Sequence, residues 1–364
     1  MKKSLVALAL AASFGPAAFA QSVTTYGIVD LAVERLSNTA PSGSDLKRMP
    51  GLTGTVPSRL GFRGVEDLGA GLKAVFTIEM GIGVDTGTLN QGGRGWGRQA
   101  FVGFQGDWGT VALGRQYTMM FWGNLGADIM GPSLFGIASL DNYFPNARFD
   151  NSIAYRGTFS GLTVGAAYTL GRDAVNAGPS PAGTNCGGES ATDTKACKGT
   201  SVMLKYDTPT WGVAVVNDSF KGGAGAFGGL TSSGLTDTRT MYNGYAVFGA
   251  TKVGVGFMPR KNEGSATTPK SELMFLSAAY TVSPQLTLDA LYAQLKFKSS
   301  ANKGTLMSAR ATYALSKRTA VYATVGQMDN NGASAFSVSG AQAGGAPAAG
   351  GSQTGMGAGI RHAF

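Results

Sequence analysis

The 364-residue sequence is poor in the residues from which enzyme active sites are most often built. It has one histidine and two cysteines, and charged residues make up 14% of the chain, against about 25% in an ordinary soluble domain. A hydrolase needs a general base, which is most often a histidine. The single one, His362, lies near the C-terminus without a serine or aspartate in a suggestive pattern beside it. We therefore expect that the protein is not an enzyme.

Signatures of nucleotide, metal and nucleic-acid binding are also missing from the sequence. It has neither a P-loop nor an HExxH motif, and its glycine clusters do not follow a strand and open a helix as a dinucleotide fingerprint requires. The formal net charge is +9, but the basic residues do not gather into one stripe. We expect no metal, no cofactor and no nucleic acid as a partner.

Long hydrophobic runs are absent, so no membrane-spanning helix is predicted. Residues 1–20 combine Lys2 and Lys3 with a short apolar stretch and a small-residue cleavage site, as in a secretory signal peptide. The apolar stretch ends near Pro16 and is too short for a membrane helix. Removing these residues, which hold two lysines and no acid, lowers the charge from +9 to +7. We expect the mature domain to comprise residues 21–364, in an exported protein.

The two cysteines, Cys186 and Cys197, lie in a segment rich in glycine, serine and threonine. A pair of cysteines in an exported protein can form a disulfide. Two unpaired thiols in a loop are the alternative that the sequence leaves open.

What the sequence contains in abundance is glycine, with 56 residues, and an alternation of polar and apolar side chains with a period of two. In LKAVFTIEM (72–80), five apolar residues share one face and Lys73 and Glu79 lie on the other. Seven short turns alternate with eight long, polar connections, which implies sixteen strands. These strands are predicted to begin near residues 22, 58, 71, 98, 109, 148, 162, 200, 211, 239, 252, 271, 285, 304, 319 and 353.

This layout predicts an all-β fold, a 16-stranded antiparallel transmembrane β-barrel. Alternating short and long connections are typical of outer-membrane barrels, and sixteen strands enclose an aqueous channel. Within lipid every backbone amide must be paired, and without a helix only a closed sheet achieves this. A secreted β-sandwich also alternates, but it does not require long and short connections to alternate.

Several segments resemble recurrent segments of the general porins of Gram-negative bacteria, above all the trimeric, sixteen-stranded type of betaproteobacteria. They are TTYGIVDLAVE (24–34), SRLGFRGVEDLGAGLKAVFTIEMGI (58–82), RQAFVGFQGDWGTVALGRQ (98–116), NSIAYR (151–156) and GAGIRHAF (357–364). The resemblance implies a water-filled outer-membrane channel for passive diffusion of small hydrophilic solutes and ions. It also implies a homotrimer surrounded by outer-membrane lipid and lipopolysaccharide. The terminal Phe364 is expected to serve as the signal for the outer-membrane assembly machinery.

The third long connection, residues 116–147, is rich in large apolar side chains such as Phe121, Trp122 and Phe135. A solvated loop does not need such side chains, whereas a loop packed against an inner wall does. We therefore expect this loop to fold into the barrel, as the resemblance also implies. A loop that caps the barrel mouth or contacts a neighbouring subunit is the alternative.

Alternation also divides the charged side chains between the two faces of the wall. In SRLGFRG (58–64), Arg59 and Arg63 alternate with Leu60 and Phe62, so the arginines are expected to face the lumen. Lys73 and Arg148 face the lumen by the same pattern.

The environment of Arg98 is apolar on both faces, but a lipid-facing arginine at the bilayer midplane would cost about 2–4 kcal/mol, so we place it inward. The resemblance matches Arg59, Arg98 and Arg148 to the family's basic cluster opposite the third loop. The predicted basic wall of the constriction is Arg59, Arg63, Lys73, Arg98 and Arg148.

Three acids are predicted to oppose this basic wall, namely Asp128 and Asp141 in the third loop and Glu79 on a strand. Arg63 could instead pair with carboxylates near its own turn. Fixed charges in a narrow channel attract counter-ions and repel co-ions, so an excess of arginine predicts anion selectivity. The alternatives are a channel specific for one substrate and a barrel with a mainly structural or adhesive role.

Overall fold

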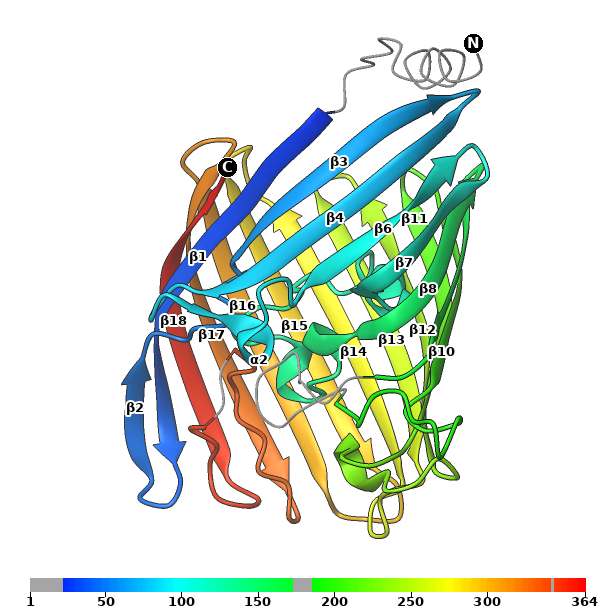
Figure 1. Cartoon of the computed structure of the whole chain (residues 1–364). Helices are drawn as coiled ribbons and strands as arrows, with labels where there is room; N and C mark the ends of the chain where they lie inside the picture. The colour runs from blue at the N-terminus through cyan, green and yellow to red at the C-terminus, as the bar shows by residue number, and fades with distance from the viewer. Residues whose placement is uncertain (1–21, 173–184, 342–343) are drawn as a thin grey trace, which may run out of the picture.

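The computed structural model describes residues 22–172, 185–341 and 344–364, so the predicted signal peptide lies outside the described residues. Sixteen long strands form one antiparallel sheet in which each strand pairs with the next along the chain (Figure 1). The long strands are β1 (Ser22–Thr39), β3 (Arg59–Gly69), β4 (Leu72–Gly83), β6 (Gln99–Gly106), β7 (Gly109–Tyr117), β8 (Arg148–Phe159), β9 (Leu162–Thr169), β10 (Gly199–Asp207), β11 (Trp211–Lys221), β12 (Thr236–Phe248), β13 (Thr251–Asn262), β14 (Lys270–Thr281), β15 (Leu286–Phe297), β16 (Lys303–Ala314), β17 (Thr319–Asn331) and β18 (Ser352–Ala363). Two short strands, β2 (Ser44–Arg48) and β5 (Thr88–Leu89), extend the loop ends of β1 and β4. The prediction of a sixteen-stranded barrel is confirmed, and each predicted start lies within three residues of the observed one.

The sheet closes on itself through β1. This strand pairs with β3 along its first part and with β18 along its second part. At the seam, the backbone N–H of Gly27 donates to the carbonyl of Phe364 at 3.0 Å, and the N–H of Phe364 donates back at 3.1 Å. A Cβ on Gly27 would lie 2.2 Å from the ring of Phe364, so only glycine allows this approach. Closure removes the unpaired edges that lipid could not satisfy.

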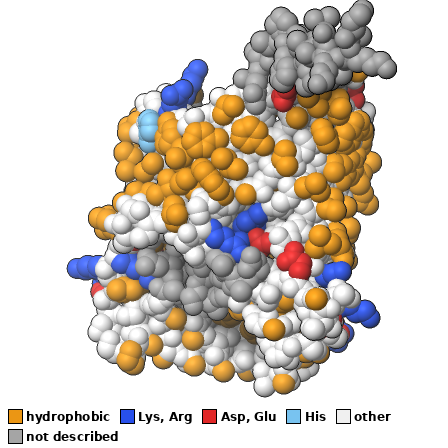
Figure 2. All heavy atoms as spheres, in the orientation of Figure 1, with side chains coloured by type: hydrophobic (Ala, Val, Ile, Leu, Met, Phe, Trp, Pro, Cys, Tyr) orange, Lys and Arg blue, Asp and Glu red, His pale blue; other side chains and the backbone are white. Residues whose placement is uncertain are grey.

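The outer face of the barrel is apolar. Leu60 pairs with Met80 and Phe62 with Ile78, all on the face opposite the predicted lumenal arginines. Hydrophobic side chains form a broad band over the short-turn half of the barrel (Figure 2). This band is the surface that a membrane protein presents to lipid. Within the three described ranges, no helix is long and apolar enough to cross a membrane.

The third loop folds into the barrel, as predicted, rather than capping its mouth. It contains α3 (Met119–Asn124) and two short 3-10 helices, η1 (Ile137–Ser139) and η2 (Phe144–Asn146). Wall hydroxyls hold its backbone: Ser277 donates to the carbonyl of Ala127 at 2.7 Å, and Ser308 to that of Phe135 at 2.8 Å. A Cβ on Gly254 of β13 would lie 2.0 Å from the carbonyl oxygen of Ala127, so the wall needs glycine where the loop passes.

The hydrophobic core lies between this loop and the inner wall. Its fully buried members come from both partners, and they include Met120, Met130, Leu134, Phe135, Ile137, Val216, Met241, Leu273, Leu306 and Met328. The barrel is therefore filled on one side by the loop, and what remains of the lumen runs beside it.

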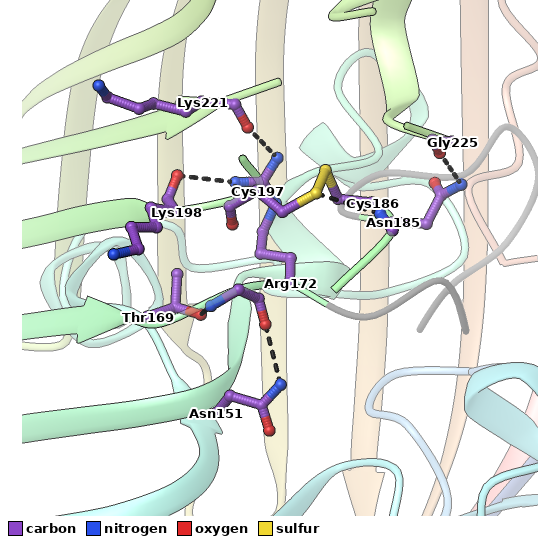
Figure 3. Close-up of a disulfide and its surroundings, with 11 residues drawn as sticks. Asn151, Thr169, Arg172, Asn185, Cys186, Cys197, Lys198, Lys221 and Gly225 are labelled. Carbon is purple, nitrogen blue, oxygen red and sulfur yellow. Dashed lines mark hydrogen bonds between the residues drawn. A yellow bond between two sulfur atoms is a disulfide. The ribbon is translucent and has the colours of Figure 1, made fainter. Parts of the chain in front are cut away.

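Cys186 and Cys197, predicted as possible partners, are bonded to each other in the structure, with their Cα atoms 5.6 Å apart. Arg172 lies beside this disulfide and donates hydrogen bonds to the carbonyls of Cys197, Lys198 and Lys221 (Figure 3). The guanidinium also lies 5.0 Å from the centre of the ring of Phe220. These contacts join the described parts of the loop between β9 and β10 to the ends of β10 and β11.

Candidate functional site: the arginine cluster beside the third loop

Three of the predicted arginines meet on the inner wall. Arg59 begins β3, Arg98 immediately precedes β6, and Arg148 begins β8. The Nη2 atom of Arg98 and the Nη2 atom of Arg148 both donate to the hydroxyl of Tyr117, at 2.5 and 3.0 Å. The Nε of Arg148 donates to the carbonyl of Arg98 at 2.9 Å. We call Arg59, Arg98 and Arg148 the arginine cluster.

One carboxylate, that of Glu79, lies within the cluster. Its Oε1 is 2.7 Å from the Nε of Arg98, and its Oε2 is 3.7 Å from the Nε of Arg59. The prediction that Glu79 opposes the basic wall is therefore wrong. Glu79 is paired across the sheet with Gly61 on one side and Gln99 on the other, which places it on the same wall as the arginines. The three guanidinium groups and this carboxylate leave a charge of +2.

A narrow cavity of about 50 Å³ separates the cluster from the third loop, with room for only a few water molecules. Arg98, Tyr117 and Arg148 line it from the wall, and Asp128 lines it from the loop together with apolar side chains such as Phe121. Of the two predicted loop acids, Asp128 is thus the one that faces the arginine cluster. Arg98 and Arg148 are only 3% and 2% exposed, so their charges act through little intervening water.

The carboxyl of Asp128 has an unusual environment. Burial raises its pKa to about 6, and the N–H of Gly131 and the charge of Arg310 offset this effect only in part. Its Oδ1 accepts the Gly131 N–H at 3.1 Å. Near neutral pH this carboxyl is therefore charged, but it becomes neutral in mild acid.

Asp141 lies on the other side of the loop and does not oppose the arginine cluster, contrary to prediction. Its carboxylate pairs with Arg239 of β12, with distances of 3.1 Å from Nε and 3.3 Å from Nη2. Burial alone would raise the pKa of Asp141, but the charges of Arg239 and Arg260 outweigh this and lower it. Arg239 also pairs with Asp237 at 2.8 Å, and Arg260 with the same carboxylate at 2.8 Å. Two cations and two anions cancel, so these four residues, the loop anchor, hold the loop without adding net charge.

The other two predicted basic residues lie nearer the short turns. Arg63 pairs across the sheet with Thr77, and its guanidinium lies 5.5 Å from the centre of the ring of Tyr26. Lys73 lies opposite Asp67 in the register of the sheet, close to the turn between β3 and β4. Both face the lumen, but neither joins the arginine cluster. Successive side chains on the same face of a strand are two residues, or almost 7 Å, apart along the strand, so these two lie farther toward the short turns.

Tyr26 and Tyr117 are functional residues that the sequence reasoning missed. Both sit near strand ends and fit the pattern of an aromatic girdle at the membrane surface, as Trp108 and Trp211 do on the outer face. Tyr26 instead pairs with Gly61 on the lumenal face and donates to Glu79 at 3.0 Å. The pairing of β7 with β8 shifts register between Gly114 and Gln116, so strict alternation no longer predicts the direction of Tyr117.

Comparisons with known proteins agree with this architecture. The sequence profile described as Gram-negative porin matches residues 5–333. Outer membrane porin protein 32 of Delftia acidovorans is 32% identical over 380 residues, spanning the full length of both chains. An outer membrane porin protein of Bordetella pertussis is 36% identical over 200 residues, or 48% of this chain and 51% of that one.

Among solved structures, the anion-selective porin from Comamonas acidovorans superposes with a TM-score of 0.76 and 25% identity, covering 94% of this chain and all of that one. A full-length relative, a family profile over most of the chain and a closed sixteen-stranded barrel all lead to the same assignment. The chain belongs to the Gram-negative porin family and forms a channel of the outer membrane for the passive diffusion of small hydrophilic solutes.

Proposed function

We propose that the channel is selective for anions. The support is the charge of the described residues lining two adjoining cavities of the lumen, which include Arg63, Arg98, Arg148 and Arg156 but a single carboxylate, Asp128. Fixed charges beside low-dielectric walls concentrate ions of opposite sign. The loop anchor on the opposite wall is neutral, so it does not cancel this excess. The similar porin from Comamonas acidovorans is described as anion-selective, which supports the same direction here.

The direct test is the reversal potential of the purified channel in a planar bilayer under a potassium chloride gradient. We expect a potential of the sign given by preferential chloride permeation. A potential of the opposite sign would contradict the proposal.

The pKa of Asp128, raised to about 6, predicts that selectivity depends on pH. When the pH falls from 7 to 5 this carboxyl is neutralised, and the anion-to-cation permeability ratio should rise by about two- to fivefold, since one unit charge at 4 Å contributes about 1 kcal/mol even in water. Reversal potentials at the two pH values measure this change.

The variant Asp128→Asn provides the control. The variant should show the higher permeability ratio already at pH 7 and little change down to pH 5. If the permeability ratio responds equally to pH in the wild type and in Asp128→Asn, groups other than Asp128 cause the effect.

The same pKa affects stability. Because the pKa of Asp128 is higher in the folded protein than in an unfolded chain, the ionised carboxyl destabilises the fold above about pH 6, and this penalty disappears as the pH falls toward 4.

We also propose that the channel assembles as a homotrimer, as the resemblance implies. A group of charges on the outer side of the wall supports a protein partner there. Arg115 pairs with Ala100, which shares the outer face with Ile78. It is 8% exposed and forms an ion pair with Asp150. Charged side chains on this face are costly against lipid, and a neighbouring subunit that covers them would avoid that cost. The mass of the detergent-solubilised protein by light scattering tests the assembly.

A further inference from the structure

A second and wider cavity lies in the lumen on the short-turn side of the arginine cluster. Its volume is about 470 Å³, within the range of roughly 300–1,000 Å³ that is usual for small-molecule sites. Tyr117 lines both this cavity and the narrow one beside the third loop, so the two adjoin. Gln105 and Thr110, which flank the short turn between β6 and β7, form part of the wider one. We call it the vestibule cavity.

The vestibule cavity has an apolar surface that passive ion flow does not require. Phe101 of β6 pairs with Thr77, which in turn pairs with Arg63, so the phenylalanine faces the lumen. Channel barrels place polar side chains on this face, and an aromatic ring here therefore needs an explanation. Trp122 reaches the same cavity from α3 of the third loop. Val75 of β4 adds a further apolar side chain to the lining, opposite Gly103 of β6.

Two arginines flank this apolar surface. The guanidinium of Arg156 lies over the ring of Trp122, 3.6 Å from its centre. Arg63 lies over the ring of Tyr26. The described residues that line the vestibule cavity include these two cations and no carboxylate. A guanidinium stacked on an aromatic face keeps its N–H edge available for a carboxylate, which it can bind with two hydrogen bonds.

We propose that the vestibule cavity is a binding subsite for planar aromatic carboxylates. The carboxylate pairs with Arg156 or Arg63, and the ring packs against Phe101 and Trp122. This inference extends the anion selectivity proposed above and rests on the same positive lumen. Selectivity for chloride needs neither Phe101 nor Trp122, however, so the two proposals can fail separately.

The first test measures block of the chloride current through the wild-type channel in a planar bilayer. Benzoate added on the short-turn side should reduce the current in a saturable way, with half block at millimolar concentration. Acetate, which has the charge without the ring, and benzyl alcohol, which has the ring without the charge, should need concentrations at least about tenfold higher. Benzoate that blocks no better than acetate would overturn the proposal, while the reversal potential independently reports on anion selectivity.

Variants locate the block within the lumen. Arg156→Gln should raise the half-blocking concentration of benzoate about tenfold, because a charge-assisted hydrogen bond is lost, and Trp122→Leu should raise it about fivefold. Lys73→Gln removes a lumenal cation outside the cavity lining and serves as the matched control, with block unchanged. Equal effects of Arg156→Gln and Lys73→Gln would indicate a general charge effect and contradict the subsite.

A measurement on the wild-type fold covers the case in which a variant does not assemble. Of the four tryptophans, Trp96, Trp108 and Trp211 have exposed side chains, whereas Trp122 lines the vestibule cavity. Saturable quenching of tryptophan fluorescence by 4-nitrobenzoate is expected in the wild type and should be lost in Trp122→Phe. Quenching that rises linearly with concentration, without saturation, would show that the aromatic anion does not occupy the cavity.

Discussion

Replacing Arg59 and Arg148 together by glutamine is expected to lower the anion-to-cation permeability ratio about tenfold. Each substitution removes one positive charge of the arginine cluster, of which Arg148 lines the narrow cavity. A unit charge contributes about 1 kcal/mol at 4 Å in water and more beside a low-dielectric wall. Arg98 is retained in this variant because it forms the 2.7 Å ion pair with Glu79, whose buried carboxylate would otherwise lose its main partner. The reversal potential in a potassium chloride gradient measures the change.

Lys73→Gln is the matched control for this experiment. It also removes one lumenal cation, but it lies opposite Asp67 near the short turn rather than in the arginine cluster. We expect the permeability ratio of this variant to change less than twofold, because water and salt screen the distant charge. If the double variant retains the wild-type ratio, the arginine cluster does not determine selectivity. If Lys73→Gln has an equal effect, the selectivity comes from the total charge of the lumen.

Replacing Arg239 by alanine is expected to destabilise the folded barrel by about 3–5 kcal/mol, since it leaves a buried carboxylate without its partner. Arg239 is 1% exposed and joins Asp141 of the third loop to Asp237 of the wall. Asp237 keeps Arg260, but Asp141 loses its ion pair, so the loop should leave the wall. The free energy of unfolding in denaturant and the single-channel conductance, which should increase, together measure this outcome.

Two variants show whether the effect comes from the buried pair. Arg35→Gln removes one member of the ion pair between Arg35 and Asp45, whose side chains are 52% and 39% exposed, and should cost less than about 1 kcal/mol. Asp141→Asn combined with Arg239→Gln removes both charges and should be less harmful than Arg239→Ala alone, because no carboxylate is left unpaired. A destabilisation of Arg239→Ala no larger than that of Arg35→Gln would show that the loop does not depend on this anchor.

Much of the fold could be predicted because each strand carries its own evidence. Alternation assigns every side chain in a regular strand to one face, and turn residues mark where the chain reverses. Arg59 and Phe62 were therefore assigned correctly to the lumen and the outer face. Where a strand is irregular, alternation alone does not assign a face, and the pairing of β7 with β8 shifts register just before Tyr117.

The sequence by itself determined the closed barrel and the lumenal face of arginines in regular strands, such as Arg59 and Arg63, and it favoured an inward third loop. Only the tertiary structure decided which charges meet. Alternation defines a face but neither the height of a side chain along the barrel axis nor the wall that a long loop approaches. Asp141 and Arg239 are 98 positions apart in the chain, and they meet because the loop crosses the lumen. Glu79 and Arg98 meet because their strands are neighbours in register. The constriction depends on such long-range contacts, and local sequence patterns do not record them.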